Sequence, residues 1–146
     1  SFKQEATKVV SIRQGYLSTG GNCTIRVRIA GEKAVITVKS KTKKASFSRF
    51  EWEYTIPVED AREMIKFSIS GLIEKERYII PAGNFFYEVD VFRGLNEGLV
   101  VAEIELSSEK DHFERPVWLG KEVTRNKRYY NAFLAKNPYI YWKKGQ

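Results

Sequence analysis

Charged side chains recur at every second position in several short segments of the chain. The pairs are Arg26 with Arg28, Lys75 with Arg77, Glu51 with Glu53, Glu88 with Asp90 and Glu103 with Glu105, and Lys39 alternates with Thr37 in the same way. Residues two apart in a β-strand point to the same side of the sheet. These faces therefore collect five bases and six acids.

Bases and paired carboxylates on the same faces point to a particular kind of ligand. Arginine forks match phosphate oxygens, and a bare anion would need bases alone. Carboxylate oxygens favour Mg²⁺ or Mn²⁺, and magnesium commonly bridges protein carboxylates and substrate phosphates. The combination predicts a site for a polyphosphate that arrives with a divalent metal ion.

The ordinary explanation of such pairs is the solvated face of an antiparallel sheet. Cross-strand ion pairs on such a face contribute only about 0.2–1 kcal/mol each. The strand of Lys75 and Arg77 fits this explanation in part, because Glu74 and Glu76 charge its other face as well. Taken together, the segments favour a binding face, since their signs cluster by strand and solvated faces also use Thr, Ser and Gln freely.

The elements that must position these residues are short alternating segments separated by turn residues, which is typical of β-strands. The predicted strands are Val9–Leu17, Thr24–Ile29, Ala34–Ser40, Ser48–Ile56, Ile73–Pro81, Phe85–Phe92 and Leu99–Leu106. Three segments break the alternation and are predicted as helices: Val58–Ser68, Ser108–Glu114 and Asn126–Lys136. Pro57 and two acids open the first helix, and Asn126 is the expected N-cap of the third. The pattern predicts a large antiparallel sheet with a few helices packed against it.

The composition sets further limits. The 146 residues suit one domain, and the net charge of +7 suits a phosphate-rich partner. Cys23 is the only cysteine and His112 the only histidine, so a disulfide, a cysteine zinc site and a histidine-based triad are excluded within the chain. We expect His112 to be a surface residue. With no apolar run of membrane length, we expect a cytoplasmic protein without membrane contact.

Several segments, taken in order, resemble the CYTH family, also called triphosphate tunnel metalloenzymes. The matching segments are Gln14-Gly15-Tyr16-Leu17, Arg26-Val27-Arg28, Thr37-Val38-Lys39, Arg49-Phe50-Glu51-Trp52-Glu53, Lys75-Glu76-Arg77-Tyr78, Glu88-Val89-Asp90-Val91-Phe92, Gly98-Leu99, Ala102-Glu103-Ile104-Glu105-Leu106, Pro116-Val117-Trp118-Leu119-Gly120, Glu122-Val123-Thr124, Arg128-Tyr129 and Asn131. They cover roughly residues 12–134 and look most like the small bacterial members. Their order and spacing, rather than any one of them, make the resemblance specific.

The resemblance implies an α+β fold dominated by antiparallel β, in which a closed eight-stranded barrel with a few flanking helices fills residues 1–146. Arg26, Arg28, Lys39, Lys75 and Arg77 would bind phosphates, and Glu103, Glu105, Glu51 and Glu53 would hold Mg²⁺ or Mn²⁺. Glu51, Glu53 and Lys75 would also act in catalysis, while Glu88 and Asp90 would line the tunnel in an unassigned role. Many members of the family pair as dimers, so a homodimer is one expectation for this chain.

One element of the family pattern is missing. Family members carry Glu-x-Glu-x-Lys on an N-terminal strand, whereas this chain begins Ser1-Phe2-Lys3-Gln4-Glu5. We expect the motif to lie upstream of Ser1, with loss of the motif as the alternative. The barrel is then expected to lack its first strand, which leaves an exposed sheet edge and impairs catalysis.

The resemblance favours a metal-dependent hydrolase of tripolyphosphate or of an organic triphosphate. A class IV-type adenylyl cyclase remains an alternative, because no residue of the pattern recognises a base. A non-catalytic module that binds polyphosphate or RNA is the second alternative. Nucleic acid is the less expected partner, because six carboxylates share faces with the bases.

Overall fold

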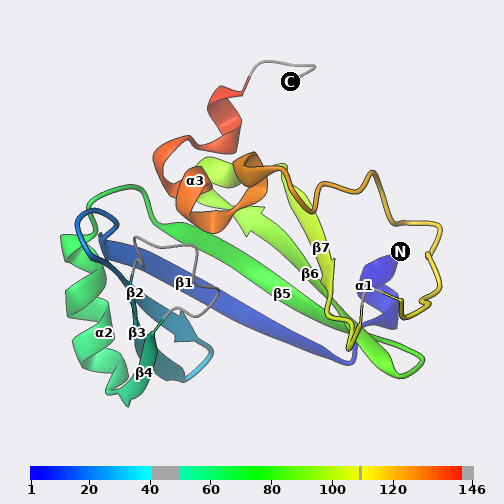
Figure 1. Ribbon diagram of the computed structural model, residues 1–146, viewed down its shortest axis with the longest axis horizontal. Coiled ribbons are helices and arrows are strands. Elements are labelled where there is room, and N and C mark those ends of the chain that lie inside the picture. Colours follow the sequence, from blue (N-terminus) through cyan, green and yellow to red (C-terminus); the bar gives the residue numbers. More distant parts are fainter. Residues whose placement is uncertain (41–49, 109, 143–146) are drawn as a thin grey trace.

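The computed structural model describes residues 1–40, 50–108 and 110–142, and its main element is one antiparallel sheet (Figure 1). The strands are β1 (Lys8–Ser18), β2 (Cys23–Ala30), β3 (Lys33–Ser40), β4 (Glu51–Ile56), β5 (Ile73–Ala82), β6 (Phe85–Arg93) and β7 (Val100–Ile104). Their order across the sheet is β4-β3-β2-β1-β5-β6-β7, with every pair antiparallel. The predicted antiparallel sheet is confirmed.

Two tight turns set the register of the long hairpins. Gly31 and Glu32 alone connect β2 to β3, and Gly83 and Asn84 alone connect β5 to β6. The first residue of each loop is glycine with φ near +60°, at +61° for Gly31 and +62° for Gly83. Two-residue hairpin loops need this conformation to match the strand twist, and glycine adopts it without steric cost.

Short helices flank the sheet. The α-helices are α1 (Phe2–Glu5), α2 (Val58–Met64) and α3 (Asn131–Lys136), and the 3₁₀ turns are η1 (Ile65–Phe67), η2 (Gly94–Asn96), η3 (Lys127–Tyr129) and η4 (Tyr139–Tyr141). Helix α2 and turn η1 together confirm the predicted helix over Val58–Ser68. Figure 1 places α2 beside β2–β4, α3 over the opposite half of the sheet and α1 near the far end of β5.

The two faces of the sheet have different roles. We call the face that bears the predicted bases and acids the charged face. Helix α2 packs on the opposite face, where Val27, Ile29 and Ala34 form an apolar cluster with Ala61 and Ile65. A second cluster on the opposite face joins β5 and β6 to α1 and to residues 113–119.

The third apolar cluster lies on the charged face itself. Helix α3 places the buried Leu134 and Ala135 against Tyr16, Ile73 and Phe92. The register puts these three sheet residues on the same side as the bases, since Gln14 pairs with Ile73 and Lys75 pairs with Phe92. The C-terminal helical segment therefore covers one end of the charged face.

Exposed ion pairs separate the two clusters on the opposite face. Arg13 Nε lies 3.5 Å from Glu74 Oε1, and Arg93 Nη2 lies 3.0 Å from Glu76 Oε1. These contacts explain why the strand of Lys75 carries charge on both sides. For Glu74 and Glu76, the ordinary explanation of a solvated face is correct.

The structure corrects the predicted helix over Ser108–Glu114. Of this segment, residues 108 and 110–114 are described, and their only helix-like feature is one hydrogen-bonded turn from Asp111 N to Ser108 O. Beyond that turn the described residues form no helix, and Phe113 packs edge-on against Tyr87, whose hydroxyl donates to Glu114 O at 2.8 Å. These contacts with the sheet stabilise the observed conformation more than the hydrogen bonds of a short helix would.

Two further helix and strand predictions are corrected in part. The segment Asn126–Lys136 is not one helix: Asn126 caps η3, but Tyr130 is extended with ψ of 140°, and α3 begins after it. Strand β7 ends at Ile104, whose pairing with Tyr87 is the last rung of the β6–β7 ladder. Glu105 therefore lies beyond the strand in which it was expected.

The sheet is not closed into the predicted barrel, while the seven described strands agree with the expected lack of the first of eight. The described residues form seven strands, and the sheet ends at β4 and β7 without pairing them. Phe50, Trp52 and Tyr54, the aromatic residues that alternate with Glu51 and Glu53, are 68%, 46% and 62% exposed. The predicted start of this strand at Ser48 lies outside the described residues.

Among residues 1–40, 50–108 and 110–142, no helix has the length and apolar character needed to cross a membrane. His112 is exposed, as predicted.

Candidate functional site

The register places four of the five predicted bases on the two strands that flank β1. Arg28 of β2 lies opposite Gln14 of β1, and Lys75 of β5 lies opposite Ile12, two residues earlier in β1. All four side chains point to the charged face, because residues two apart in a strand share a side. Two of the three base-bearing strands, β2 and β5, are thus neighbours of the same central strand.

Lys75, Arg77 and Asp90 form a buried network at the centre of this face. Lys75 Nζ lies 2.7 Å from Asp90 Oδ2, and Arg77 donates from Nε to Asp90 Oδ1 at 2.7 Å and from Nη2 to Oδ2 at 2.9 Å. Lys75 is only 2% exposed and Asp90 4%. Burial tends to raise the pKa of Asp90, but the hydrogen bonds and charges of Arg77 and Lys75 outweigh it and hold that pKa below its usual value.

Lys75 has further partners from the other side of the network. Asn131, the first residue of α3, accepts a hydrogen bond from Lys75 Nζ at 3.1 Å. The ammonium group also lies 5.4 Å from the centroid of the Phe92 ring. Burial lowers the pKa of Lys75, and the charge of Asp90 opposes that shift. The lysine is therefore held on several sides.

Glu88 extends the network toward β7. Its Oε2 lies 2.6 Å from Arg77 Nη1, and its side chain is 42% exposed. Glu103 of β7 lies directly opposite Glu88 in the ladder and points to the same face. Arg77 is thus held by two carboxylates, while Glu103 forms no ion pair with another described residue.

The two arginines of β2 have a different environment. Within the part of the chain that the structure describes, neither Arg26 nor Arg28 forms an ion pair with a carboxylate. Arg28 Nε instead donates to the neutral amide oxygen of Gln14 at 2.9 Å. Burial lowers the pKa of Arg28, and the nearby positive charges of Arg26 and Arg77 lower it further. These two guanidinium groups carry positive charge that no described carboxylate contact offsets.

The remaining predicted residues lie toward β4. Lys39 Nζ is 3.9 Å from Glu51 Oε1, and both side chains are more than 40% exposed. Thr37, which is 2% exposed, donates to Glu53 Oε1 at 3.4 Å. The strand order thus runs from acids on β4, through bases on β3 and β2, to the buried network on β5 and β6.

The four predicted metal ligands are not brought together. Glu51 and Glu53 belong to β4, while Glu103 lies in β7 and Glu105 just after it, at the opposite edge of the sheet. Among the described residues, no group of three or more His, Cys, Asp or Glu side chains is arranged to hold a metal ion. The sequence correctly placed Glu51, Glu53 and Glu103 in strands but did not predict their separation.

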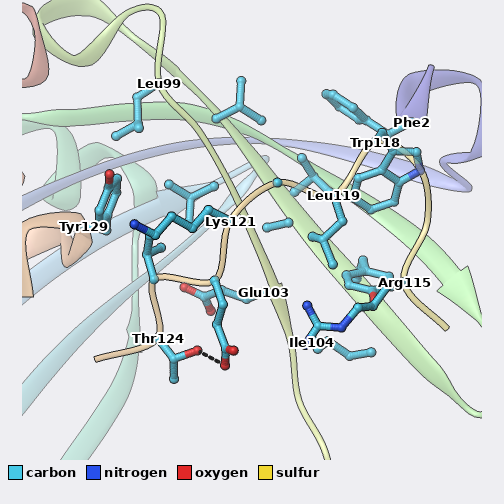
Figure 2. Close-up of a pocket in the computed structure, with 18 of the residues that line it drawn as sticks. Phe2, Leu99, Glu103, Ile104, Arg115, Trp118, Leu119, Lys121, Thr124 and Tyr129 are labelled. Atoms are coloured by element: carbon cyan, nitrogen blue, oxygen red, sulfur yellow. Dashed lines mark hydrogen bonds between the residues drawn. The ribbon is translucent and has the colours of Figure 1, made fainter. Parts of the chain in front are cut away.

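A pocket of about 820 Å³ lies along β7 rather than among the bases (Figure 2). Figure 2 shows Glu103, Lys121 and Thr124 on one flank and Trp118 and Leu119 on the other. None of the five predicted phosphate-binding bases lines it. The pocket lies at the free edge of β7, because no further strand among the described residues pairs with β7.

The family-model comparison matches the CYTH domain over residues 1–135. The chain belongs to the CYTH domain family. The resemblance drawn from the motifs of the sequence is therefore confirmed.

Relatives of this CYTH chain include two inorganic triphosphatases. That of Acetivibrio thermocellus is 44% identical over 137 residues, which cover 93% of this chain and 86% of the relative. That of Nitrosomonas europaea is 36% identical over 140 residues, which cover 92% and 90%. A crystal structure of an inorganic triphosphatase aligns with a TM-score of 0.72 and 34% identity over 88% of this chain and 86% of that one. The seven-stranded sheet matches the CYTH fold.

Two polar residues of the charged face had no assigned role in the sequence analysis. Gln14 and Asn131 contact Arg28 and Lys75, yet both are neutral and neither belongs to a charged pair. The alternation of Ile12, Gln14 and Tyr16 could have placed Gln14 on a sheet face. The contact of Asn131 could not have been found, because it joins a helix to a strand 56 positions away.

Proposed function

We propose that the chain is a metal-dependent triphosphatase that hydrolyses inorganic tripolyphosphate on the charged face of its sheet. The observation that carries the proposal is the pair of β2 arginines, Arg26 and Arg28, whose charge no described carboxylate contact offsets. Partly buried cations that lack an ion pair with a carboxylate favour an anionic ligand. Relatives at 44% and 36% identity that are inorganic triphosphatases support the same substrate.

The bases divide the work of binding. Arg26 and Arg28 would grip phosphoryl oxygens from β2, and Lys39 would add a more mobile charge from β3. Lys75 and Arg77 would stabilise the charge that develops on the transferred phosphoryl group. Asp90 keeps these two bases in place and charged, which gives it the structural role that the sequence left unassigned. Glu88 would fix the far side of Arg77.

The chemistry of the carboxylates fits a hard divalent cation. Glu103 and Glu105 form no ion pair with another described residue, so their oxygens remain available as the ligands that Mg²⁺ or Mn²⁺ prefers. Glu51 and Glu53 would complete the set or orient the attacking water. Closing of the sheet between β4 and β7 into a tunnel would bring the two pairs toward each other. When bound, the metal ion would neutralise phosphate charge and polarise a phosphoryl oxygen.

The decisive experiment measures phosphate release from tripolyphosphate, ATP and thiamine triphosphate with Mg²⁺, with Mn²⁺ and with EDTA. We expect metal-dependent turnover of tripolyphosphate. Glu103→Gln should lower it by at least about tenfold, the size of effect found even for residues that only support metal ligands. Glu32→Gln, a matched change in the exposed β2–β3 turn, should leave turnover unchanged.

Other outcomes would contradict the proposal in different ways. Formation of cyclic AMP and pyrophosphate from ATP, without tripolyphosphate hydrolysis, would identify a cyclase. Binding of polyphosphate without turnover under any metal would identify a binding module. Tight binding of oligonucleotides that weakens steeply with salt would point to nucleic acid as the partner.

A further inference from the structure

Gln14 is a fully buried polar residue in the middle of the charged face. It is 0% exposed and lies between Ile12 and Tyr16 along β1, opposite Arg28 on one side and Ile73 on the other. A glutamine so placed must satisfy its amide within the protein. The hydrogen-bond partners of the Gln14 amide therefore indicate its role.

The contact with Arg28 fixes how the amide is oriented. Arg28 Nε can only donate, so the group facing it at 2.9 Å must be Gln14 Oε1. Gln14 Nε2 then points elsewhere, and it has no hydrogen-bond partner in the described structure. Arg26 Nε is a second buried donor without a partner. The Tyr16 hydroxyl is near both side chains, but neither Gln14 Nε2 nor Arg26 Nε forms a hydrogen bond with it. Burial raises the pKa of Tyr16, while Arg26, Arg28 and Gln14 act to lower it.

The neutrality of this acceptor distinguishes Arg28 from the bases on β5. Arg77 is oriented by two carboxylates, Asp90 and Glu88, which also offset its charge. Gln14 orients Arg28 with an oxygen that bears no net charge, so this contact does not offset the positive charge of the guanidinium. A glutamate would fit the same space and bind Arg28 more strongly, but it would cancel that charge.

We propose that Gln14 is a positioning residue of the phosphate-binding face: Oε1 aims Arg28 at the triphosphate without neutralising it, and the unpaired Nε2 adds a donor beside Arg26. This inference rests on the proposed binding of a triphosphate. The two unpaired buried donors support it, because such groups destabilise the free protein and acquire acceptors when an anion arrives. The role belongs to the binding step rather than to bond cleavage.

The substitution Gln14→Glu separates this role from simple packing. It keeps the shape of the side chain and an acceptor for Arg28. It also exchanges the amide donor for an oxygen and the neutral group for a negative charge. Titration calorimetry with tripolyphosphate in EDTA should show binding weakened by about tenfold or more, the range expected when a hydrogen bond to a charged group is lost. Arg13→Gln is the matched control, because it makes the same change of net charge one residue away on the opposite face. That variant should bind as the wild type does.

A second variant covers the case in which Gln14→Glu does not fold, which thermal unfolding would reveal. Gln14→Met fills a similar volume but offers neither the acceptor nor the donor. It should raise KM for tripolyphosphate more than it lowers kcat. Wild-type affinity in whichever of these two variants folds would overturn the inference.

The same measurements separate this inference from the proposed function. If the wild type binds tripolyphosphate without hydrolysing it, the triphosphatase proposal fails, while weaker binding by Gln14→Glu still supports the positioning role. If the wild type hydrolyses tripolyphosphate and the Gln14 variants match it in affinity and KM, only the positioning role fails. A wild type that neither binds nor hydrolyses tripolyphosphate overturns both.

Discussion

Asn131 accepts a hydrogen bond from Lys75 Nζ at 3.1 Å, although 56 positions separate the two residues in the chain. The contact ties the first residue of α3 to the most deeply buried base of the charged face. The C-terminal helical segment therefore contributes to the site as well as to the apolar cluster beside it.

Removal of this contact should impair hydrolysis. In Asn131→Ala, Lys75 keeps Asp90 but loses the acceptor that fixes its direction, and we expect kcat/KM for tripolyphosphate to fall by about tenfold. Asn137→Ala is the matched control, since Asn137 lies just after the same helix, is exposed, and its side chain forms a hydrogen bond only to Phe133 O. Equal kinetics of the two variants would show that Asn131 has no positioning role.

Asp90 and Glu88 should differ sharply in their effect on stability. Asp90→Asn removes the charge that compensates two buried bases, and loss of one partner of a buried ion pair costs about 3–5 kcal/mol. Glu88→Gln removes a half-exposed partner and should cost less than about 1 kcal/mol. Urea unfolding at neutral pH measures both values. A cost for Asp90→Asn no larger than that for Glu88→Gln would contradict the central position of Asp90.

The lowered pKa of Asp90 predicts the direction of the acid response. Because the folded pKa lies below the unfolded value of about 3.9, the ionised carboxyl stabilises the fold fully above that value. The stabilisation is lost as the pH falls from about 4 through the folded pKa. Urea unfolding between about pH 3 and pH 6 should therefore show a steeper decline for the wild type than for Asp90→Asn. Parallel curves would indicate that Asp90 does not titrate with a shifted pKa.

Gly15 should tolerate no side chain. A Cβ there would overlap Ser68 Oγ and lie 3.1 Å from Leu72 Cδ2. Ser68 Oγ cannot turn aside freely, because it donates to Ile65 O at 2.6 Å. Gly15→Ala should thus lower the free energy of unfolding by about 1–3 kcal/mol, as overpacking does.

Gly20 provides the matched control for that substitution. A Cβ at Gly20 meets no atom within 4 Å, so Gly20→Ala should be neutral or stabilising by up to about 1 kcal/mol. Thermal and urea unfolding of the two variants tests the pair. A stable Gly15→Ala variant would mean that the segment around Ser68 is loosely packed against β1.

Most of the sheet could be predicted because its signal is local. Alternation fixed which residues share a face, and Arg28, Lys75 and Asp90 lie on one side as that pattern required. Glycines in the short loops marked the turns, and Gly31 and Gly83 have the positive φ that such loops need. The strand ends were less predictable: β7 stops at Ile104, opposite Tyr87, although its partner strand β6 continues to Phe85.

The remaining features depend on contacts that no short segment encodes. Ser108–Glu114 has a helix-like composition, yet its described residues form no helix and instead contact Tyr87 of the sheet through Phe113 and Glu114. The separation of Glu51 from Glu103 follows from the order of strands rather than from their spacing. Gln14 had no assigned role because a neutral side chain adds nothing to a charge pattern.

The ion pairs of Arg13 with Glu74 and of Arg93 with Glu76 have a consequence for how the molecule opens. These charged, solvent-exposed side chains lie between the two apolar clusters of the opposite face. The clusters are therefore connected through the backbone of the sheet rather than through packed side chains. Regions with separate packing can unfold locally at different free energies. The helix α2 side and the α1 side are therefore expected to lose amide-exchange protection independently, and the backbone ladder of β1 and β5 should be the last part to exchange.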